Sequence, residues 1–391
     1  MKDVFVVESL RTPFGSFGGV LSDVEAPKLA ATVIGSALER TGLDPAAVSE
    51  VILGQVLSGG AGQAPARQAM RLAGIPDGVH AMTINKVCGS GLKSIMLGAG
   101  SIMLGDSSLV AAGGMENMSL TPFILKKARY GYRMGHGELL DLMIYDGLQD
   151  PYSGKHMGDI AEAAVAKHGF SREEQDEFAI RSYRLAQEAV KGGVFKDEIV
   201  PVVKNGKKGD EVVADDEEPF KVDFAKLIQL RPAFKKDGTI TAGNASSISD
   251  GAAVTLLADE GALKKHNLKP RARLVAYATY SMHPELYTDA PVGAIQAVCA
   301  RAGLKVADID LFEINEAFAA VTMIAIKQLG LDPAKVNVNG GACAIGHPIG
   351  ASGARLAATV IRELHRRQSR YGLATLCIGG GEAVAVIFER V

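Results

Sequence analysis

The chain alternates short apolar runs with segments of helical spacing in its first and last thirds. Between residues 1 and 117 the apolar runs predict strands, and apolar positions three and four residues apart predict helices. The predicted strands are 4–7, 51–56, 81–87 and 109–113, and the predicted helices are 26–41, 64–73 and 91–104. Such alternation is typical of an α/β protein with a buried, largely parallel sheet.

The same alternation resumes at about residue 272. It predicts strands at 274–278, 309–314 and 374–378, the last of them terminal, and helices at 292–302, 317–329 and 349–365. The two regions share a pattern in which a glycine-rich turn leads into a helix of small residues, CGSGLKSIMLGAGSI (88–102) and GHPIGASGARLAATVI (346–361). An apolar strand ending in glycines follows each of them. We interpret this as a duplicated fold unit.

The middle of the chain has a different pattern. Aromatic, basic and loop-forming residues dominate 122–137, and 171–191 predicts a helix with Ser171 as N-cap and Glu174 three residues on. A charged segment at 204–218 predicts a solvated hairpin tip. We interpret 118–247 as an insertion that builds a lid or a ligand surface.

Composition limits the classes of protein that fit. At 391 residues the chain exceeds the roughly 250–300 residues of a single core. A net charge of −2 favours neither nucleic acid nor an anionic membrane. The start resembles no signal peptide, and no uninterrupted apolar stretch reaches the about 18 residues of a membrane span. The four cysteines lack CxxC spacing, so we expect no metal site and a reduced, cytoplasmic protein in which a conspicuous cysteine is reactive.

Cys88 ends a strand-like run in TINKVCGSGLKS (83–94), directly before a helix. The N–H groups and positive dipole end at a helix start stabilise a thiolate and should lower the pKa of the thiol. Gly89 and Gly91 would let a ligand or another chain come close to the sulfur. A buried structural cysteine is the alternative reading of this segment.

His347 lies among glycines in NVNGGACAIGHPIGASGAR (337–355), just before a predicted helix. So much glycine indicates that the backbone approaches something bulky or anionic. An imidazole near Cys88 could accept its proton, as a Cys–His nucleophile pair requires. A loop histidine satisfied by backbone groups is the alternative, and Cys343 in the same loop is interpreted as an apolar filler.

Cys377 ends an apolar strand, and three glycines follow Ile378. If the halves are duplicates, Cys377 and Cys88 approach the same interface. Removing a proton from a carbon beside a thioester needs a base, and consecutive glycine N–H groups could stabilise the enolate oxygen. A buried strand cysteine is the alternative. Asn315, in EINEAFAA (313–320), could cap the next helix or position a water or a carbonyl oxygen.

Together these motifs resemble the thiolase family over essentially the whole chain. The blocks NKVCGSGLKS, GNASSISDGAA, NEAFA, NGGACAIGHPIGASGAR and LCIGGGEA stand in the family's order, with RTPFGSFGG and GQAPARQA upstream. The resemblance implies two duplicated five-layered α/β/α/β/α halves with an inserted loop domain. It places the N-terminal half at 1–117 and 248–271, the loop domain at 118–247 and the C-terminal half at 272–391.

The resemblance also implies residue roles. Cys88 matches the acylated nucleophile, His347 the base that activates it, and Cys377 the acid/base for the α-proton. One oxyanion hole is similar to that of His347 with an Asn315-held water, and the other to the N–H groups of Cys88 and Gly379. The residues that match the substrate and coenzyme A pocket are His156, Met157, Phe234, Ser246, Phe318, Lys221, Lys226 and Tyr287. It implies coenzyme A thioesters as substrates, no permanently bound cofactor and no metal.

The Cys88 block and the segment 120–156 are most similar to short-chain, tetrameric members. The implied reaction is the reversible conversion of two acetyl-CoA into acetoacetyl-CoA and CoA in a homotetramer. Three departures concern Pro219, where an arginine is frequent and Lys221 or Lys226 could grip phosphates instead, Tyr287 in place of a methionine, and Glu382–Ala383 after the glycines. A broader 3-ketoacyl-CoA thiolase of degradation and a non-catalytic acyl-CoA or lipid-binding protein remain the alternatives.

Overall fold

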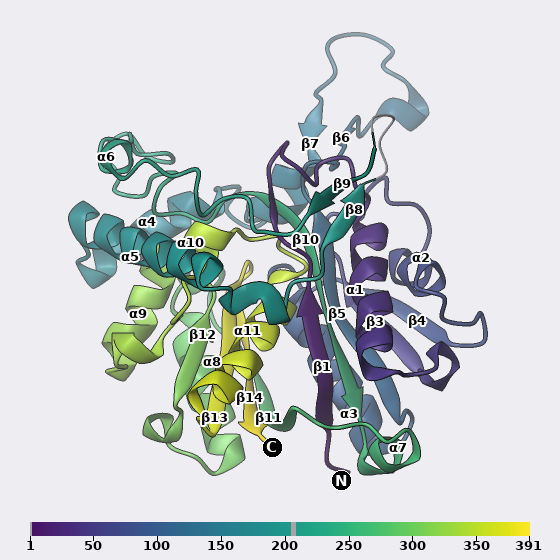
Figure 1. Ribbon diagram of the computed structural model, residues 1–391. Helices are drawn as coiled ribbons and strands as arrows, with labels where there is room; N and C mark the ends of the chain where they lie inside the picture. The colour runs from purple at the N-terminus through teal and green to yellow at the C-terminus, as the bar shows by residue number, and fades with distance from the viewer. Residues whose placement is uncertain (1, 205–208) are drawn as a thin grey trace.

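The computed structural model describes residues 2–204 and 209–391, which form a layered α/β structure (Figure 1). One long sheet has the strand order β12-β13-β14-β11-β1-β10-β5-β3-β4. Its N-terminal part contains β1 (Phe5–Arg11), β10 (Ser249–Ala258), β5 (Leu109–Asn117), β3 (Glu50–Gly54) and β4 (His80–Ile84), with β2 (Gly15–Ser16) paired to β10. Its C-terminal part contains β11 (Ala272–Ser281), β14 (Glu382–Arg390), β13 (Tyr371–Ile378) and β12 (Leu311–Ile314). The two parts join through two residue pairs between β1 and β11, Phe5 with Arg273 and Val6 with Ala272.

Two helices, α3 (Ser90–Leu104) and α11 (Ser352–Arg367), pack against each other and against strands of both parts of the sheet. The outer face of the N-terminal part is covered by α1 (Ala26–Thr41) and α2 (Pro65–Leu72). The outer side of the C-terminal part is covered by α8 (Ala290–Ala302), and α9 (Ala319–Leu329) packs on α8. The predicted α/β/α/β/α layering is therefore confirmed, and the two halves share the middle helix layer. The predicted domain limits stay a prediction.

The middle layer depends on two glycines. A Cβ added to Gly91 of α3 would lie 2.9 Å from the backbone nitrogen of Ala354, and one added to Gly353 of α11 would lie 2.5 Å from that of Leu92. Both distances are too short for a side chain, so glycine lets the two helix N-termini approach.

By length and composition alone, the segment Val87–Leu104, 18 residues of mean hydropathy 1.4, could cross a membrane. It contains Lys93, and its helix is packed between the two parts of the sheet.

The prediction of a largely parallel sheet is wrong. Only β3 with β4, β3 with β5, and β12 with β13 are parallel among the described strands. The sequence did not predict two strands, β10 and β14. β10 lies between β1 and β5, β14 lies between β11 and β13, and each runs antiparallel to both neighbours. In β10 all ten residues are buried, so it shows no alternation of apolar and polar positions. The predicted strand at 374–378 is not the last strand of the chain. After it the chain turns back through Gly380 and Gly381, at φ +92° and +86°, into β14.

Helices with clear capping signals were predicted closely. The helix α1 has the predicted bounds and ends before Gly42, whose φ of +63° is left-handed. The helix α5 (Arg172–Lys191) has the predicted capping box, in which the Ser171 side chain accepts from the Glu174 N–H and the Glu174 side chain accepts from the Ser171 N–H. In contrast, α9 and α11 begin two and three residues later than predicted, because the preceding loops carry Asn315 and His347.

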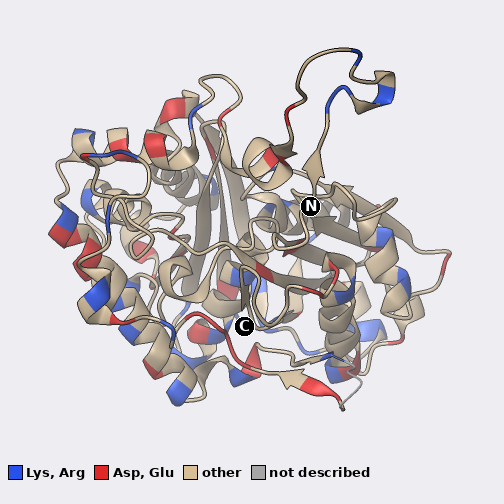
Figure 2. Cartoon of the chain, turned by 90° about the horizontal axis from the view of Figure 1, so that it is seen from above, with Lys and Arg blue, Asp and Glu red and all other residues tan. Residues whose placement is uncertain are grey.

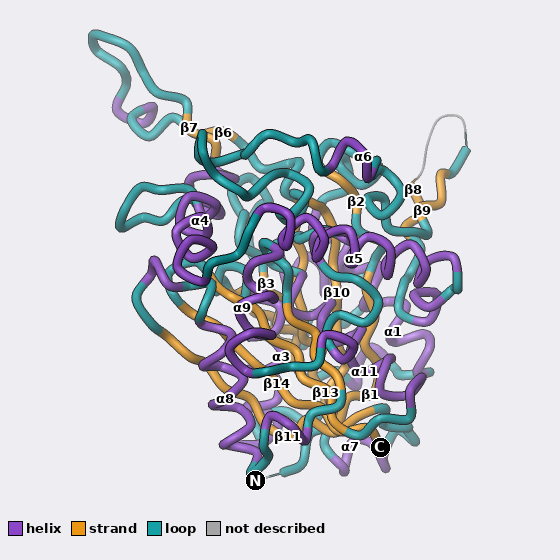
Figure 3. Tube along the Cα trace, turned by 90° about the vertical axis from the view of Figure 1, so that its left-hand side faces the viewer, coloured by secondary structure: helices purple, strands orange, loops and turns teal. Residues whose placement is uncertain are grey.

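The insertion lies along one end of the sheet. It contains α4 (Met157–His168), α5, α6 (Phe224–Leu227) and a π-helical segment, Met143–Leu148. The predicted hairpin at 204–218 is present as β8 (Val202–Lys204) and β9 (Glu211–Val213), which pair antiparallel, and residues 205–208 of its predicted tip lie outside the described residues. The segment between β6 (Phe123–Ile124) and β7 (Leu140–Asp141) projects well away from the body (Figure 3). Two further short helices are α7 (Glu260–Lys265) and α10 (Ala342–Ile345).

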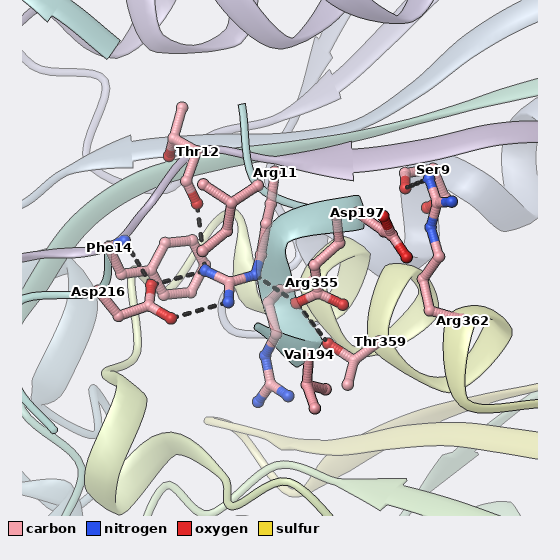
Figure 4. Close-up of polar contacts among 12 residues, drawn as sticks. Ser9, Arg11, Thr12, Phe14, Val194, Asp197, Asp216, Arg355, Thr359 and Arg362 are labelled. Atoms are coloured by element: carbon pink, nitrogen blue, oxygen red, sulfur yellow. Dashed lines mark hydrogen bonds and ion pairs between the residues drawn. The ribbon is translucent and has the colours of Figure 1, made fainter. Parts of the chain in front are cut away.

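Charged residues have two arrangements. On the outer helices and loops, basic and acidic side chains are intermixed (Figure 2). Inside the molecule, Arg11 is fully buried and contacts Glu198 through Nε (2.6 Å) and Asp216 through Nη1 (2.6 Å) and Nη2 (2.8 Å) (Figure 4). Thr359 of α11 donates to the same Glu198 carboxylate at 3.2 Å. This cluster ties β1, the insertion and the middle helix layer together.

Candidate active site

Cys88 lies in a tight turn between β4 and α3. Val87 before it has a φ of +45°, which is uncommon for a β-branched residue and stores strain. Ser90 holds the turn, because its hydroxyl donates to the carbonyl of Val87 (2.7 Å) and accepts from the N–H of Lys86 (2.8 Å). A Cβ on Gly89 would collide with Ile378, so the glycine lets the segment after β13 pack against this turn.

The predicted low pKa of Cys88 is wrong for the resting protein. Burial raises the pKa of the thiol to about 11, although the backbone N–H groups of Gly379 and Cys88 itself favour the thiolate, and the carboxylate of Glu116 raises it further. Removing the thiol from water therefore outweighs the donors around it. Cys88 needs a base to become a nucleophile.

His347 is placed to be that base. Its Nδ1 lies 2.6 Å from Oγ of Ser352, and this hydroxyl is 3.0 Å from the carbonyl oxygen of Pro348. Because the single hydroxyl proton goes to the carbonyl, Nδ1 must carry the ring proton and Nε2 keeps its lone pair. Burial, helped by the positive charge of Arg355, lowers the pKa of His347 to about 3. The imidazole is thus neutral and able to accept a proton.

Asn315 lies directly after β12 and is fully buried. Its Nδ2 is 3.4 Å from both ring nitrogens of His347. Its Oδ1 has no hydrogen-bond partner among the described residues. The alternative in which Asn315 caps the next helix is wrong, because α9 begins at Ala319 after Phe318 with no side-chain cap. The unpartnered oxygen leaves Asn315 able to hold a water beside the imidazole.

Cys377 ends β13 with 1% of its surface exposed. Burial and the neighbouring Cys88 raise the pKa of its thiol well above the ordinary value. A cavity of about 610 Å³ is lined by Cys88, His347, Cys377 and Gly379, so the two cysteines and the imidazole share one site. Asn315 is not part of the cavity lining and contacts the ring of His347 instead.

The rest of the cavity wall is mainly apolar. His156 caps α4 by accepting the N–H of Gly158 through Nδ1 (3.1 Å), and its ring stacks on that of Phe234 at 4.9 Å. The predicted pocket residues that line the cavity are His156, Met157, Phe234, Ser246, Phe318, Lys221 and Tyr287. The structure does not bring Lys226 to this cavity, because it is on the exposed helix α6 beside Asp223. In 2–204 and 209–391 no cluster of three or more His, Cys, Asp or Glu residues could hold a metal.

Two family models together match almost the whole chain. The model described as "Thiolase, N-terminal domain" matches residues 4–261, and "Thiolase, C-terminal domain" matches residues 268–390. The chain belongs to the thiolase family.

Individual thiolases with similar sequences match from end to end. "Acetyl-CoA acetyltransferase" of Chromobacterium violaceum is 52% identical over 390 residues, which cover 99% of this chain and 100% of that protein. The Pseudomonas aeruginosa protein of the same name is 50% identical and fully covered. A crystal structure of the Bacillus anthracis acetyl-CoA acetyltransferase superposes with a TM-score of 0.97 at 42% identity, covering 100% of this chain and 99% of that one.

The thiolase site also depends on residues that the sequence did not single out. Gly341 makes room for the buried carboxyl of Glu316, where a Cβ would collide, and a Cβ on Gly350 would lie 2.7 Å from Oε2 of Glu116. The glycines around His347 therefore do face anionic groups, but these are the protein's own glutamates. Glu316 accepts from Ser182, Asn337 and the N–H of Cys343, and so fixes the loop that leads to His347. An acidic residue directly after Asn315, inside an apolar run, was the available signal.

Proposed function

We propose that this thiolase is an acetyl-CoA C-acetyltransferase that reversibly condenses two acetyl-CoA into acetoacetyl-CoA and CoA. The observation that carries the proposal is the shared cavity of Cys88, His347 and Cys377, next to the N–H group of Gly379. Relatives about half identical to this chain and named acetyl-CoA acetyltransferase support it.

The first half-reaction forms an acetyl-enzyme. Nε2 of His347 takes the proton of Cys88, and the thiolate attacks the carbonyl carbon of acetyl-CoA. His347 and the water expected on Asn315 are the proposed donors to the oxyanion. As the tetrahedral intermediate collapses, the CoA sulfur leaves and takes the proton of Cys377. The enzyme then holds an acetyl group on Cys88, a protonated His347 and a Cys377 thiolate.

The second half-reaction forms the carbon–carbon bond. The Cys377 thiolate takes a methyl proton from a second acetyl-CoA, and the resulting carbon nucleophile attacks the acetyl carbon on Cys88. The N–H groups of Cys88 and Gly379 are the proposed donors for the oxygen that becomes negative, and such donors contribute several kcal/mol. Cys88 leaves as a thiolate and recovers its proton from His347. Acetoacetyl-CoA is released, and all three residues return to their starting forms.

Tyr287 supports a preference for short acyl groups. Its ring is buried in the cavity wall, and its hydroxyl donates to the carbonyl of Met157 at 2.9 Å, which fixes the ring in place. A bulky side chain that cannot swing away limits the space beside the two cysteines.

A profile of thiolysis against chain length tests the proposed substrate. We expect kcat/KM for acetoacetyl-CoA to exceed that for a 3-ketoacyl-CoA of eight carbons by about tenfold or more, since each misfitting methylene costs roughly 1–3 kcal/mol. Faster cleavage of the longer substrate would instead identify a degradative 3-ketoacyl-CoA thiolase. No turnover with any of them would leave only the binding-protein alternative.

We also propose a homotetramer. The projecting segment between β6 and β7 exposes large apolar side chains, with Tyr130 at 88%, Met134 at 96% and Leu139 at 61%. Apolar groups gathered on a protrusion favour contact with another copy. Sedimentation of the intact chain and of a Tyr130→Ser/Met134→Ser variant tests this, because the variant should dissociate to smaller species.

A cytoplasmic location and the absence of a bound cofactor remain predictions.

A further inference from the structure

A buried carboxylate connects the two halves beside the catalytic cavity. Glu116, near the end of β5, has no exposed surface. Its Oε2 accepts from the N–H groups of Val56 (3.0 Å) and Gly350 (2.9 Å), and its Oε1 from that of Leu57 (3.1 Å). In the described part of the chain no lysine, arginine or histidine pairs with it. Three backbone donors therefore meet one carboxylate that has no cationic partner.

The three donors come from both halves. Val56 and Leu57 follow β3 of the N-terminal half, whereas Gly350 is three residues after His347 in the C-terminal half. Ile349, between His347 and Gly350, lines the catalytic cavity and packs with Val56, Leu57 and Cys88 in one apolar cluster. The carboxylate thus joins the loop that carries the imidazole to β5 and to the segment after β3, the strand that pairs with β4, which leads to Cys88.

We propose that Glu116, in its ionised form, is a positioning residue that holds His347 in register with Cys88 for acetyl transfer. The proposal rests on the proposed function, since it concerns the rate of the same half-reaction. A carboxylate is needed because each of its oxygens accepts, whereas a protonated or amide group turns one acceptor into a donor facing an N–H. A displacement of about 1 Å at such a position can cost on the order of 100-fold in rate.

The proposal predicts a pH dependence. Burial raises the pKa of Glu116 to about 7, the N–H groups of Val56, Leu57 and Gly350 oppose this, and the charge of Asp250 on β10 adds to it. The two titratable groups of the same half-reaction, His347 with a pKa of about 3 and Cys88 with a pKa of about 11, do not change charge near neutrality. We therefore expect the rate of Cys88 acetylation to rise with pH and level off above about pH 7.

Stability should respond in the opposite direction. The pKa of Glu116 rises from its ordinary 4.5 to about 7 in the folded chain, so the native state holds the proton more tightly. The stabilisation from this proton is fully present below pH 4.5 and is lost as pH rises to about 7. If Glu116 served only to stabilise the fold, its protonated form would be the better one. Positioning of His347 requires its charged form instead.

The test is rapid-quench acetylation of Cys88 by labelled acetyl-CoA between about pH 5.5 and 9, in the wild type and three variants. Glu116→Gln should acetylate about 100-fold more slowly than the wild-type plateau. Its plot of rate against pH should also lack the rising limb below about pH 7 that is expected of the wild type. Asp250→Asn, the matched control, should keep the limb and move it to lower pH, because it removes a negative charge next to Glu116. Glu116→Asp keeps a carboxylate and should keep the limb with a lower plateau.

The outcomes separate the two proposals. A wild type that is never acetylated at Cys88 overturns the proposed function. A wild type that is acetylated, with the same limb surviving in Glu116→Gln, overturns the role of Glu116. Thermal melts show which variants are folded, and if Glu116→Gln is not, loss of the limb in folded Glu116→Asp contradicts the proposal.

Discussion

Replacement of Cys377 by alanine is expected to separate the two half-reactions. The variant should still accept an acetyl group on Cys88, because His347 activates the thiol and, in the absence of Cys377, can return that proton to the departing CoA sulfur. It should fail to condense, because no other titratable side chain is assigned to take the methyl proton. Loss of a residue that acts in proton transfer typically costs 10²- to 10⁴-fold, so we expect condensation to fall by about 10⁴-fold. A spectrophotometric assay of acetoacetyl-CoA formation measures this.

Cys299→Ala is the matched control. Cys299 is a buried cysteine on α8 in the outer helix layer and does not line the catalytic cavity. Its loss should leave condensation close to the wild-type rate, with only the stability cost of a small cavity. Condensation that survives Cys377→Ala at a wild-type rate would remove Cys377 from the mechanism.

Replacement of Arg11 by methionine is expected to destabilise the fold by about 3–5 kcal/mol, the usual cost of leaving a buried charge without its partner. Arg11 is fully buried, and its guanidinium meets two carboxylates, Glu198 and Asp216, that are also buried. Methionine keeps much of the side-chain volume but no positive charge. The two carboxylates would then face each other without compensation, and chemical denaturation should show the loss.

Thr359→Val supplies the comparison. It removes only the hydroxyl that donates to Glu198 at 3.2 Å, so we expect a loss of about 1 kcal/mol. If Arg11→Met were no more destabilising than Thr359→Val, the cluster would not be the link between β1, the insertion and α11 that the geometry indicates.

The local parts of the fold were accessible from the sequence because their signals are local. The helix at 26–41 ends at a glycine, and the helix at 171–191 begins with a capping box, so both bounds follow from neighbouring residues. Strand direction was not accessible in the same way. β10 joins β1 and β5 across more than a hundred residues, and because all ten of its residues are buried, its sequence shows no alternation that would give its partners or its orientation.

The candidate site was also predictable only where its signals are local. Cys88, His347 and Cys377 stood out because each lies at a glycine-rich turn next to a strand or helix, and the structure places all three on one cavity. Glu116, Glu316 and Ser352 did not stand out, because their roles come from donors supplied by distant segments. The pKa of Cys88 was predicted in the wrong direction, since the sequence reveals the helix start but not the depth of burial.

The proposed acetylation of Cys88, in a cavity shared with His347 and Cys377, underlies both half-reactions. Its most direct test is mass spectrometry of peptides from the chain after brief incubation with acetyl-CoA. We expect one acetyl group on the peptide that contains Cys88, in the wild type and in Cys377→Ala, and none in Cys88→Ala. Acetylation of another residue in place of Cys88, or undiminished acetylation of Cys88→Ala, would contradict it.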